Sequence, residues 1–315
     1  MANPEHLVIA ASGSKAINDW VEKNPSVFLD LKGAVLSRRN IRIANFSGAN
    51  LEDSTLFCSD IDFSKFINSN LKNCDLSCVS SIRGNFTGAI LDKASLAYGI
   101  FVSSIFRDAS LKETKLSTAN MISSDLSNAT IVKSDASFVN FTLANLTNAD
   151  LTESNLMASI FNGTSLDQTN FDGATLHLTI FSNCNFSSCK GIDKVKHAAS
   201  SCVDYSSISL TFHSTGNRLT TEFSQFLLKT GLPKEYIDSL PKIISSIKYF
   251  SCFISYGEPD KQFAVKLRDA LIAIGINCWI YALDSKPGEE TWKEITTKRR
   301  ESQKMIVVFH QKFDT

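Results

Sequence analysis

Cysteine and histidine supply many of the metal ligands and nucleophiles of proteins, so their spacing is the first indicator of chemistry in a sequence. This chain of 315 residues has eight cysteines and five histidines. The cysteines form no Cys-x-x-Cys pair. The histidines show no ligand spacing, and they are His6, His177, His197, His213 and His310. These residues therefore predict no metal, no redox centre and no bound cofactor.

The dominant pattern of the sequence is a period of five residues between Leu31 and Phe186. Every fifth residue in this range is Leu, Ile, Phe or Met, with the exceptions of Ser81 and Ala136. A second column, three residues further on in each repeat, consists of Ala, Ser, Thr, Cys or Gly. Its exceptions are Arg39, Val79 and Val139. Two interlocked columns at one period indicate a structural repeat.

A period of five fits neither the 3.6 residues of a helical turn nor the two residues of a strand. If five residues form one side of a square coil, four repeats complete a turn and both columns point inward. Backbone groups then pair with the coils above and below, and about eight coils give a rod roughly 38 Å long. Cys74, Cys184 and Cys189 belong to the second column, where we expect each thiol to pack as a small apolar group.

Several stretches resemble the pentapeptide-repeat family, whose pattern is Ala, Asp or Asn, Leu or Phe, and two polar residues. Segments 46–55 and 144–153 match it closely. The resemblance implies a mainly β fold, with a right-handed quadrilateral β-helix over 31–190. It also implies a helical cap over 1–30, because the open end of a solenoid exposes unpaired backbone groups.

The two gaps in the large column predict a local irregularity. Ser81 and Ala136 leave space inside, while Val79 and Val139 place larger residues in the small column nearby. We therefore expect a coil that is either distorted or locally refilled there, with a bulge or a widened turn at 80–84.

Residues 191–247 lack the repeat and have a different composition. The segment 220–229 places Phe223 and Phe226 on one face of a helix. A second short helix follows, which Pro241 is expected to interrupt. So many apolar side chains argue against a flexible linker. We predict a helical connector that packs on the last coil and covers its open end.

From residue 248 onward, strands and helices alternate. Strands are expected at 249–256, 276–281 and 304–309, and helices at 260–274 and 291–303. This order is typical of a parallel α/β sheet, whose loops gather at the carboxyl ends of the strands. We therefore predict a partial α/β, flavodoxin-like domain over 248–315.

This segment resembles the toll/interleukin-1 receptor (TIR) domain of the bacterial type. The matching motifs are Phe253 to Tyr256, Gly275 to Trp279, Pro287-Gly288 and Val307 to Phe309. His310 departs from the family, in which serine is usual at this place. The segment has roughly half the length of a usual TIR domain. It is therefore expected to be either part of a longer product or a decayed protein with half a sheet.

Bacterial TIR domains often resemble NAD glycohydrolases, so the resemblance implies NAD+ as a possible substrate. Counting back from His310 puts the family's catalytic carboxylate on Glu294, with Glu290 as the alternate. Such a carboxylate would stabilise the oxocarbenium character that develops as nicotinamide leaves. The alternative is that Glu294 is a surface charge near a helix N-terminus. The substrate-binding residues implied by family position are Ser255, Tyr256, Gly257, Trp279, Asp284 and Trp292. Trp279 is equally compatible with the core.

Together the resemblances imply a bacterial signalling or defence protein in which a β-helical scaffold or sensor gathers TIR effectors. The implied partners are other TIR domains and further copies of this chain, through the TIR domain and possibly the rod. A non-catalytic TIR adaptor is the first alternative. The second is a DNA mimic that binds a topoisomerase, which needs a dense negative surface. Between residues 134 and 189 the chain has only five acidic residues, so we do not expect it to mimic or bind nucleic acid.

Composition and charge agree with a cytoplasmic protein of at least two domains. The formal net charge is zero. No apolar run has the length of a membrane span, and the first residues lack the basic start of a signal peptide. We therefore expect no membrane partner.

Overall fold

In the computed structural model a β-turn recurs every five residues of the repeat segment. In the first repeat the N–H of Ala34 donates to the carbonyl of Leu31 at 2.9 Å, and Gly33 has a φ of 71°. A positive φ at the third residue alone defines a type II turn. This left-handed position recurs in every repeat up to Asn183. The period of five is therefore a turn period, and each repeat bends the chain once.

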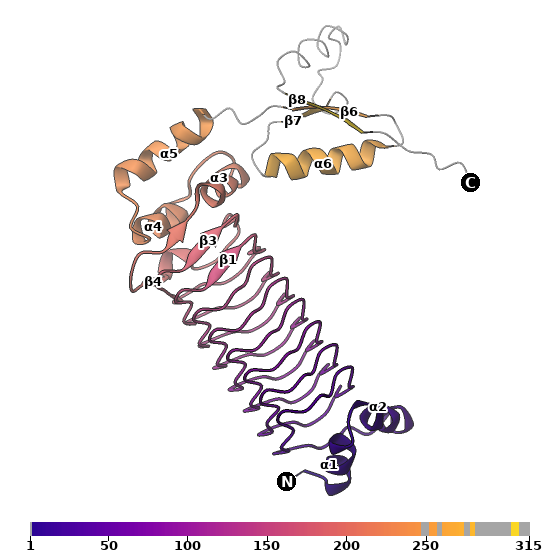
Figure 1. Cartoon of the computed structure of the whole chain (residues 1–315). Coiled ribbons are helices and arrows are strands. Elements are labelled where there is room, and N and C mark those ends of the chain that lie inside the picture. The colour runs from indigo at the N-terminus through magenta and orange to yellow at the C-terminus, as the bar shows by residue number, and fades with distance from the viewer. Residues whose placement is uncertain (1, 247–251, 257–259, 274–277, 281–303, 309–315) are drawn as a thin grey trace, which may run out of the picture. The chain divides into compact units, whose positions relative to one another are not determined.

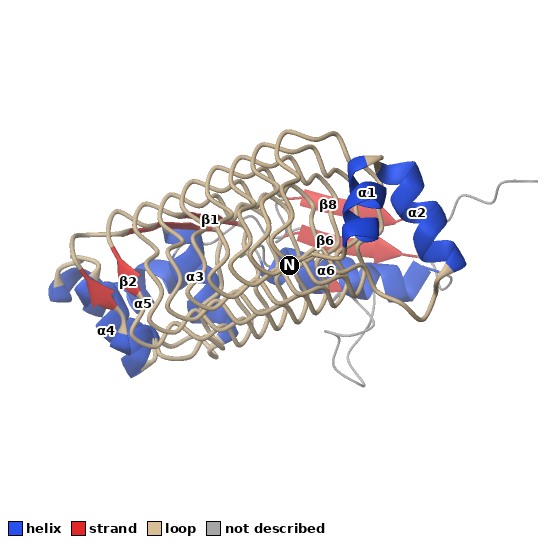
Figure 2. Ribbon diagram, turned by 90° about the horizontal axis from the view of Figure 1, so that it is seen from below, coloured by secondary structure: helices blue, strands red, loops and turns tan. Residues whose placement is uncertain are grey.

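Backbone pairing joins residues that lie twenty positions apart. Asp30 bridges to Asn50 and Asn50 bridges to Asn70, both in parallel. The N–H of Leu31 donates to the carbonyl of Asn50 at 2.7 Å. Four repeats thus return the chain to the same side, one layer further along the β-helix (Figure 1). Figure 2 draws most layers as loop, since most of the bridges involve single residues.

Both columns form the core of the β-helix. Every large-column residue from Leu31 to Phe186 is at most 2% exposed. Two runs of phenylalanine rings stack along the axis with centroids 4.7 to 5.1 Å apart, close to the spacing of paired strands. The first run is Phe46, Phe66, Phe86 and Phe106, and the second is Phe141, Phe161 and Phe181. Large side chains therefore stack on large ones along the axis.

The coil at Ser81 is regular, so the predicted bulge at 80–84 is wrong. Arg83 keeps the left-handed φ of 55°, and the N–H of Gly84 donates to the carbonyl of Ser81 at 3.2 Å. The neighbouring column explains the regularity. A Cβ at Gly84 would lie 2.2 Å from Ser81 Oγ and 3.1 Å from the ring of Phe86. Glycine lets these two side chains close the space without moving the backbone.

The coil at Ala136 is regular as well. The N–H of Ala136 donates to the carbonyl of Asn155 at 2.8 Å, and Phe138 keeps a φ of 58°. The N–H of Val139 lies 3.4 Å from the carbonyl of Ala136, which is longer than in most turns of the β-helix. The larger Val139 is thus accommodated by a slightly opened turn.

Two helices cover the N-terminal end of the β-helix: α1 (Pro4–Ala11) and α2 (Ser14–Lys23). His6 Nδ1 accepts from the backbone N–H of Asp30 at 2.9 Å. The side chain of Asn18 accepts from the N–H of Asn45 at 2.8 Å and donates to the carbonyl of Ile43 at 3.0 Å. The cap therefore satisfies backbone groups of the first coil that have no preceding layer.

The C-terminal end of the β-helix contains short strands and a covering helix. The strands β1 (Ile160–Asn162), β3 (Ile180–Ser182) and β5 (Cys202–Val203) form one parallel sheet, and β2 (Thr175–Leu176) pairs with β4 (Lys196–His197). A 3-10 turn (Ile192–Lys194) lies between β3 and β4 in the chain. In α4 (Thr221–Lys229) the buried rings of Phe223 and Phe226 lie 5.5 and 5.2 Å from the ring of Phe186. This is the covering that the sequence predicted.

The structure describes residues 2–246, 252–256, 260–273, 278–280 and 304–308. They belong to two compact units, one of Met1–Ser207 with Thr220–Ile237 and one of Ile208–Leu219 with Asp238–Thr315. Helices α3 (Tyr205–Ser214) and α5 (Lys234–Ser246) extend across the boundary. Helix α5 continues through Pro241, so the predicted interruption there is wrong. Proline removes one hydrogen bond from a helix, and α5 persists despite that loss.

Candidate functional site

A three-stranded parallel sheet forms the C-terminal unit. Strand β6 (Cys252–Tyr256) is central and pairs with β7 (Cys278–Ile280) on one side and with β8 (Lys304–Val308) on the other. The chain therefore runs from β6 to β7 on one side of β6, and later to β8 on the opposite side. In open α/β sheets such a reversal leaves a crevice at the carboxyl ends of the strands, where ligands bind. By this rule the expected position of a ligand is at the carboxyl ends of β6 and β8.

Helix α6 (Lys261–Ala273) packs against this sheet. Ile254 of β6 and Ala264 of α6 are fully buried together. Tyr256 is partly buried against the same cluster, which is expected because residues two apart in a strand share a face. The other partly buried members are Leu267, Leu271 and Cys278. Tyr256 is thus anchored in the core at the point where β6 ends.

Three of the predicted site residues lie in the described strands. Ser255 pairs with Val307 and Tyr256 pairs with Val308, so both stand at the carboxyl end of β6. Trp279 pairs with Phe253 and therefore lies on the other side of β6 from β8. Five predicted residues lie outside the described residues: Gly257, Asp284, Glu290, Trp292 and Glu294.

Val308 was not named as a site residue from the sequence. The register places it beside Tyr256 at the carboxyl end of the sheet. The apolar run that ends in Val308 is visible in the sequence, but its alignment with β6 is a tertiary feature.

Cys74 and Cys184 are fully buried in the small column, where the sequence predicted that they pack as small apolar groups, whereas Cys189 is partly exposed. Burial raises the pKa of Cys74 and of Cys184 to about 12, and it also raises the pKa of Cys189. Thiols with such pKa values are poor nucleophiles and poor metal ligands. Among the described residues, no group of three or more His, Cys, Asp or Glu side chains could hold a metal ion.

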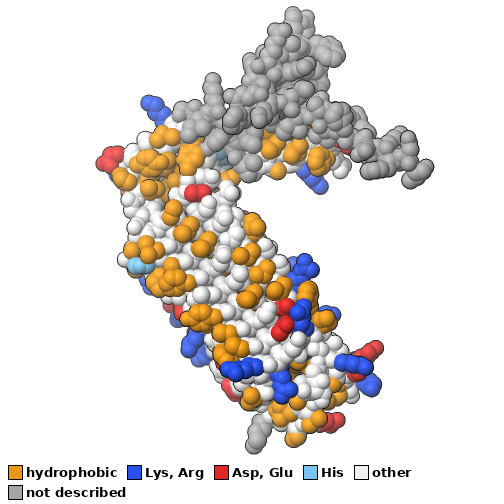
Figure 3. Space-filling model, in the orientation of Figure 1, with side chains coloured by type: hydrophobic (Ala, Val, Ile, Leu, Met, Phe, Trp, Pro, Cys, Tyr) orange, Lys and Arg blue, Asp and Glu red, His pale blue; other side chains and the backbone are white. Residues whose placement is uncertain are grey.

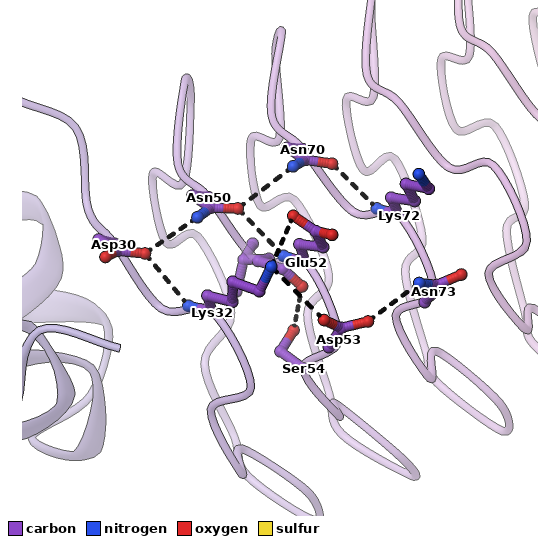
Figure 4. Close-up of polar contacts among 10 residues, drawn as sticks. Asp30, Lys32, Asn50, Glu52, Asp53, Ser54, Asn70, Lys72 and Asn73 are labelled. Atoms are coloured by element: carbon purple, nitrogen blue, oxygen red, sulfur yellow. Dashed lines mark hydrogen bonds and ion pairs between the residues drawn. The ribbon is translucent and has the colours of Figure 1, made fainter. Parts of the chain in front are cut away.

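The acidic side chains near the C-terminal end of the β-helix are engaged in local contacts. Asp135 accepts from the amide of Asn155 at 3.0 Å, and Asp150 accepts from Asn170 at 3.1 Å. Figure 4 shows the same ladder of Asp and Asn side chains near the N-terminal end. Asp172 pairs with Lys194 at 2.9 Å. These carboxylates take part in the coil-to-coil ladder and in local ion pairs.

The hydrogen-bonded turns and the parallel sheet define a two-part protein, a β-helical solenoid followed by an α/β domain. Comparison with protein families identifies both parts. Pentapeptide repeats, in eight copies, match residues 30–73, 104–148, 124–163 and 149–187, and the TIR domain matches residues 252–314. The chain therefore carries pentapeptide repeats followed by a C-terminal TIR domain.

Solved pentapeptide-repeat structures resemble the β-helix. HetL, involved in heterocyst differentiation regulation in the cyanobacterium Nostoc sp. strain PCC 7120, is 20% identical over 66% of this chain and 98% of that chain, with a TM-score of 0.33. A trypsin-treated form of QnrB1, a plasmid-mediated fluoroquinolone resistance protein, is 16% identical over 61% of this chain and 98% of that chain, with a TM-score of 0.35. At such TM-scores the fold assignment rests on the hydrogen-bond pattern itself. No curated protein matches this sequence.

The combination of pentapeptide repeats with a TIR domain is that of a signalling or defence protein in general. TIR domains commonly associate with themselves and with other TIR domains. Within the described residues, no helix is both long and apolar enough to cross a membrane.

Proposed function

We propose that the chain is a signalling or defence protein whose β-helix, a rod of about eight four-sided coils, presents TIR domains that cleave NAD+ when copies assemble. The observation that carries the proposal is the strand order β7-β6-β8 with all strands parallel. This order supports a ligand crevice at the carboxyl ends of β6 and β8, beside Tyr256 and Val308.

The proposed reaction breaks the glycosidic bond between nicotinamide and ribose. The bonding electrons leave with nicotinamide, which departs as a neutral base, and water then adds to the ribosyl cation. Products are nicotinamide, ADP-ribose and a proton. Glu294 is the proposed carboxylate that stabilises the cation, with Glu290 as the alternate. Tyr256 would form the floor of the crevice, since its backbone is fixed by β8 and its ring by α6.

Release of nicotinamide from NAD+ by the whole natural product, including any residues encoded after Thr315, tests this function. We expect turnover that rises with protein concentration, because association assembles the site. Glu294→Gln keeps the shape of the side chain and removes its charge, so it should abolish turnover while thermal unfolding stays unchanged.

Glu290→Gln is the matched control, since the same substitution is made four residues earlier. It should leave turnover close to that of the parent. If Glu290 proves essential and Glu294 dispensable, the catalytic carboxylate is Glu290.

The alternative function is a non-catalytic TIR adaptor. It predicts no nicotinamide release from the parent at any protein concentration, together with retained association between TIR domains. Measuring association and turnover on the same samples separates the two functions.

A further inference from the structure

One side of the β-helix has no charged side chain over six successive layers. This neutral side consists of the outward positions of 76–80, 96–100, 116–120, 136–140, 156–160 and 176–180, none of which is Lys, Arg, Asp or Glu. Other sides carry ion pairs such as Lys93 with Glu113 and Lys133 with Glu153, each at 3.6 Å. On the face drawn in Figure 3, hydrophobic side chains recur along the β-helix, and charged ones gather toward its N-terminal half.

Five large apolar side chains are exposed on the neutral side: Ile100 and Ile180, at 43% and 42%, and three that protrude further. Tyr98, Phe138 and Leu178 are 64%, 55% and 57% exposed. Each occupies the left-handed turn position, with φ of 59°, 58° and 53°. The same conformation recurs in every repeat and is occupied by many residue types, from Gly and Asn to Ile43, Phe63 and Leu143. What sets this side apart is that its exposed apolar side chains are gathered where no charged residue intervenes, which is a mark of an interaction surface.

Large and small residues alternate along one column of the neutral side. The column is Cys78, Tyr98, Thr118, Phe138, Ala158 and Leu178. The backbone holds these residues in line, because each N–H donates to a carbonyl in the next layer. These bonds are 2.9 Å from Cys78 to Ala97, 3.0 Å from Tyr98 to Ser117, and 2.7 Å from Phe138 to Met157. The result is a straight ridge with knobs at every second layer.

We propose that two copies of this chain pair through their neutral sides in antiparallel orientation, about a two-fold axis midway between Thr118 and Phe138. Every knob then faces a small residue of the partner. Phe138 packs on Thr118 of the partner subunit, Tyr98 packs on Ala158 of the partner subunit, and Leu178 packs on Cys78 of the partner subunit. A two-fold contact uses the same patch on both copies, so the patch must complement itself.

The lack of charged residues on the neutral side permits pairing, and the alternation of large and small residues selects the antiparallel orientation. The neutral span runs from Ser77 to Ile180, and its midpoint coincides with the midpoint of the alternating column. A parallel pair would set knob against knob and leave the small residues facing gaps. In the antiparallel pair each large side chain fills the space opposite a small residue, and no like charges come together.

The contact area indicates a weak dimer. The ridge spans five layer spacings, roughly 24 Å. A single side of this length is smaller than the ~800 Å² per partner of standard interfaces. Because the TIR segment follows the C-terminal end of the repeats, an antiparallel pair has one TIR attachment at each end. Contacts between TIR domains of successive pairs would then raise the effective concentration of the rods.

Disulfide trapping tests the register of the pair in the full chain. The exposed cysteines Cys58, Cys78 and Cys202 are first changed to serine. Thr118→Cys and Phe138→Cys chains are then mixed and oxidised with diamide, which takes up the two thiol hydrogens. We expect the mixed disulfide to form in large excess over the disulfide of either chain with itself. Trapping of each variant with itself would indicate parallel pairing and overturn the proposal.

A matched pair of positions controls for random collision. Ser123 and Leu143 occupy the same turn position in the same two layers on the adjacent side, with φ of 57° and 59°. Ser123→Cys mixed with Leu143→Cys should give little mixed disulfide. Equal trapping of both pairs would show that the neutral side is not an interface.

A charge on the ridge provides a second measurement. Phe138→Asp should shift the chain toward a smaller species in sedimentation velocity, because two carboxylates would be buried near the axis. Leu143→Asp, on the adjacent side and 63% exposed, should sediment like the parent. Identical sedimentation profiles for Phe138→Asp and Leu143→Asp would overturn the proposal. It would also be overturned if the parent chain bound lipid vesicles, Phe138→Asp abolished that binding, and no disulfide-linked pair could be trapped. None of these measurements depends on NAD+ turnover, so the pairing and the proposed enzyme can fail separately.

Discussion

The ring of Phe223 in α4 stacks on the ring of Phe186 at the end of the large column, with centroids 5.5 Å apart. The solenoid core therefore continues into the connector, and its C-terminal end is closed by an aromatic contact. Phe223→Ala should destabilise the β-helical unit by about 3–5 kcal/mol, since it removes a fully buried ring. Chemical denaturation would measure the loss. Leu228→Ala in the same helix should cost much less, because Leu228 is exposed.

A buried ring in the middle of a stack should be equally sensitive. Phe161 lies between Phe141 and Phe181, with centroids 5.1 and 4.8 Å away. Phe161→Ala should cost about 3–5 kcal/mol, because a column fixed on both sides cannot collapse into the cavity. Leu143→Ala is the control at an outward position and should change the unfolding free energy by less than about 1 kcal/mol. Equal losses would contradict the inward and outward register.

Replacing either of two buried serines, Ser81 and Ser104, with alanine should have opposite effects on the stability of the β-helical unit. No described residue bonds to Ser81 Oγ, which is buried, whereas Ser104 Oγ donates to the carbonyl of Ser81 and accepts from the N–H of Gly84 at 3.1 Å. Ser81→Ala should therefore stabilise the unit by about 1 kcal/mol, since it removes an unsatisfied hydroxyl. Ser104→Ala should destabilise it by about the same amount or more. Thermal unfolding of the two variants and the parent would test both predictions.

Acid should weaken the start of α3 through Asp204. Burial by itself raises the pKa of Asp204, but hydrogen bonds from Ser207 and Ser182 outweigh it and leave the pKa below its usual value. The N–H of Ser207 donates to Oδ1 at 2.7 Å, and Ser182 Oγ donates to Oδ2 at 2.7 Å. The folded state thus holds fewer protons than the unfolded state. The contribution of Asp204 to stability is present above the ordinary carboxyl pKa and disappears as the pH falls through the lowered value.

Asp204→Asn should therefore reduce stability at neutral pH and flatten the loss between about pH 5 and pH 2. Denaturant midpoints measured across this range would show it. Parallel curves for the variant and the parent would exclude Asp204 as a source of the acid sensitivity.

The sequence alone determined the β-helix and its closure. A period of five admits neither a helix nor a strand, so the two columns could only face a common interior. The faces of the connector helix also followed from sequence, because Phe223 and Phe226 recur at helical spacing. The proposed pairing surface could not be predicted from the sequence pattern. Tyr98 and Phe138 lie on one ridge because each layer of the β-helix contains twenty residues, which only the backbone pairing shows.

Tertiary structure decided the details that depend on neighbouring layers. A gap at Ser81 predicts a distortion when the chain is considered one repeat at a time, but the missing Cβ of Gly84 lets the interior close around a regular backbone. Likewise, Tyr256 meets Val308 through a register between distant strands, which no local pattern contains. Periodicity specifies which side chains are inside, and packing between layers and strands decides what each of them contacts.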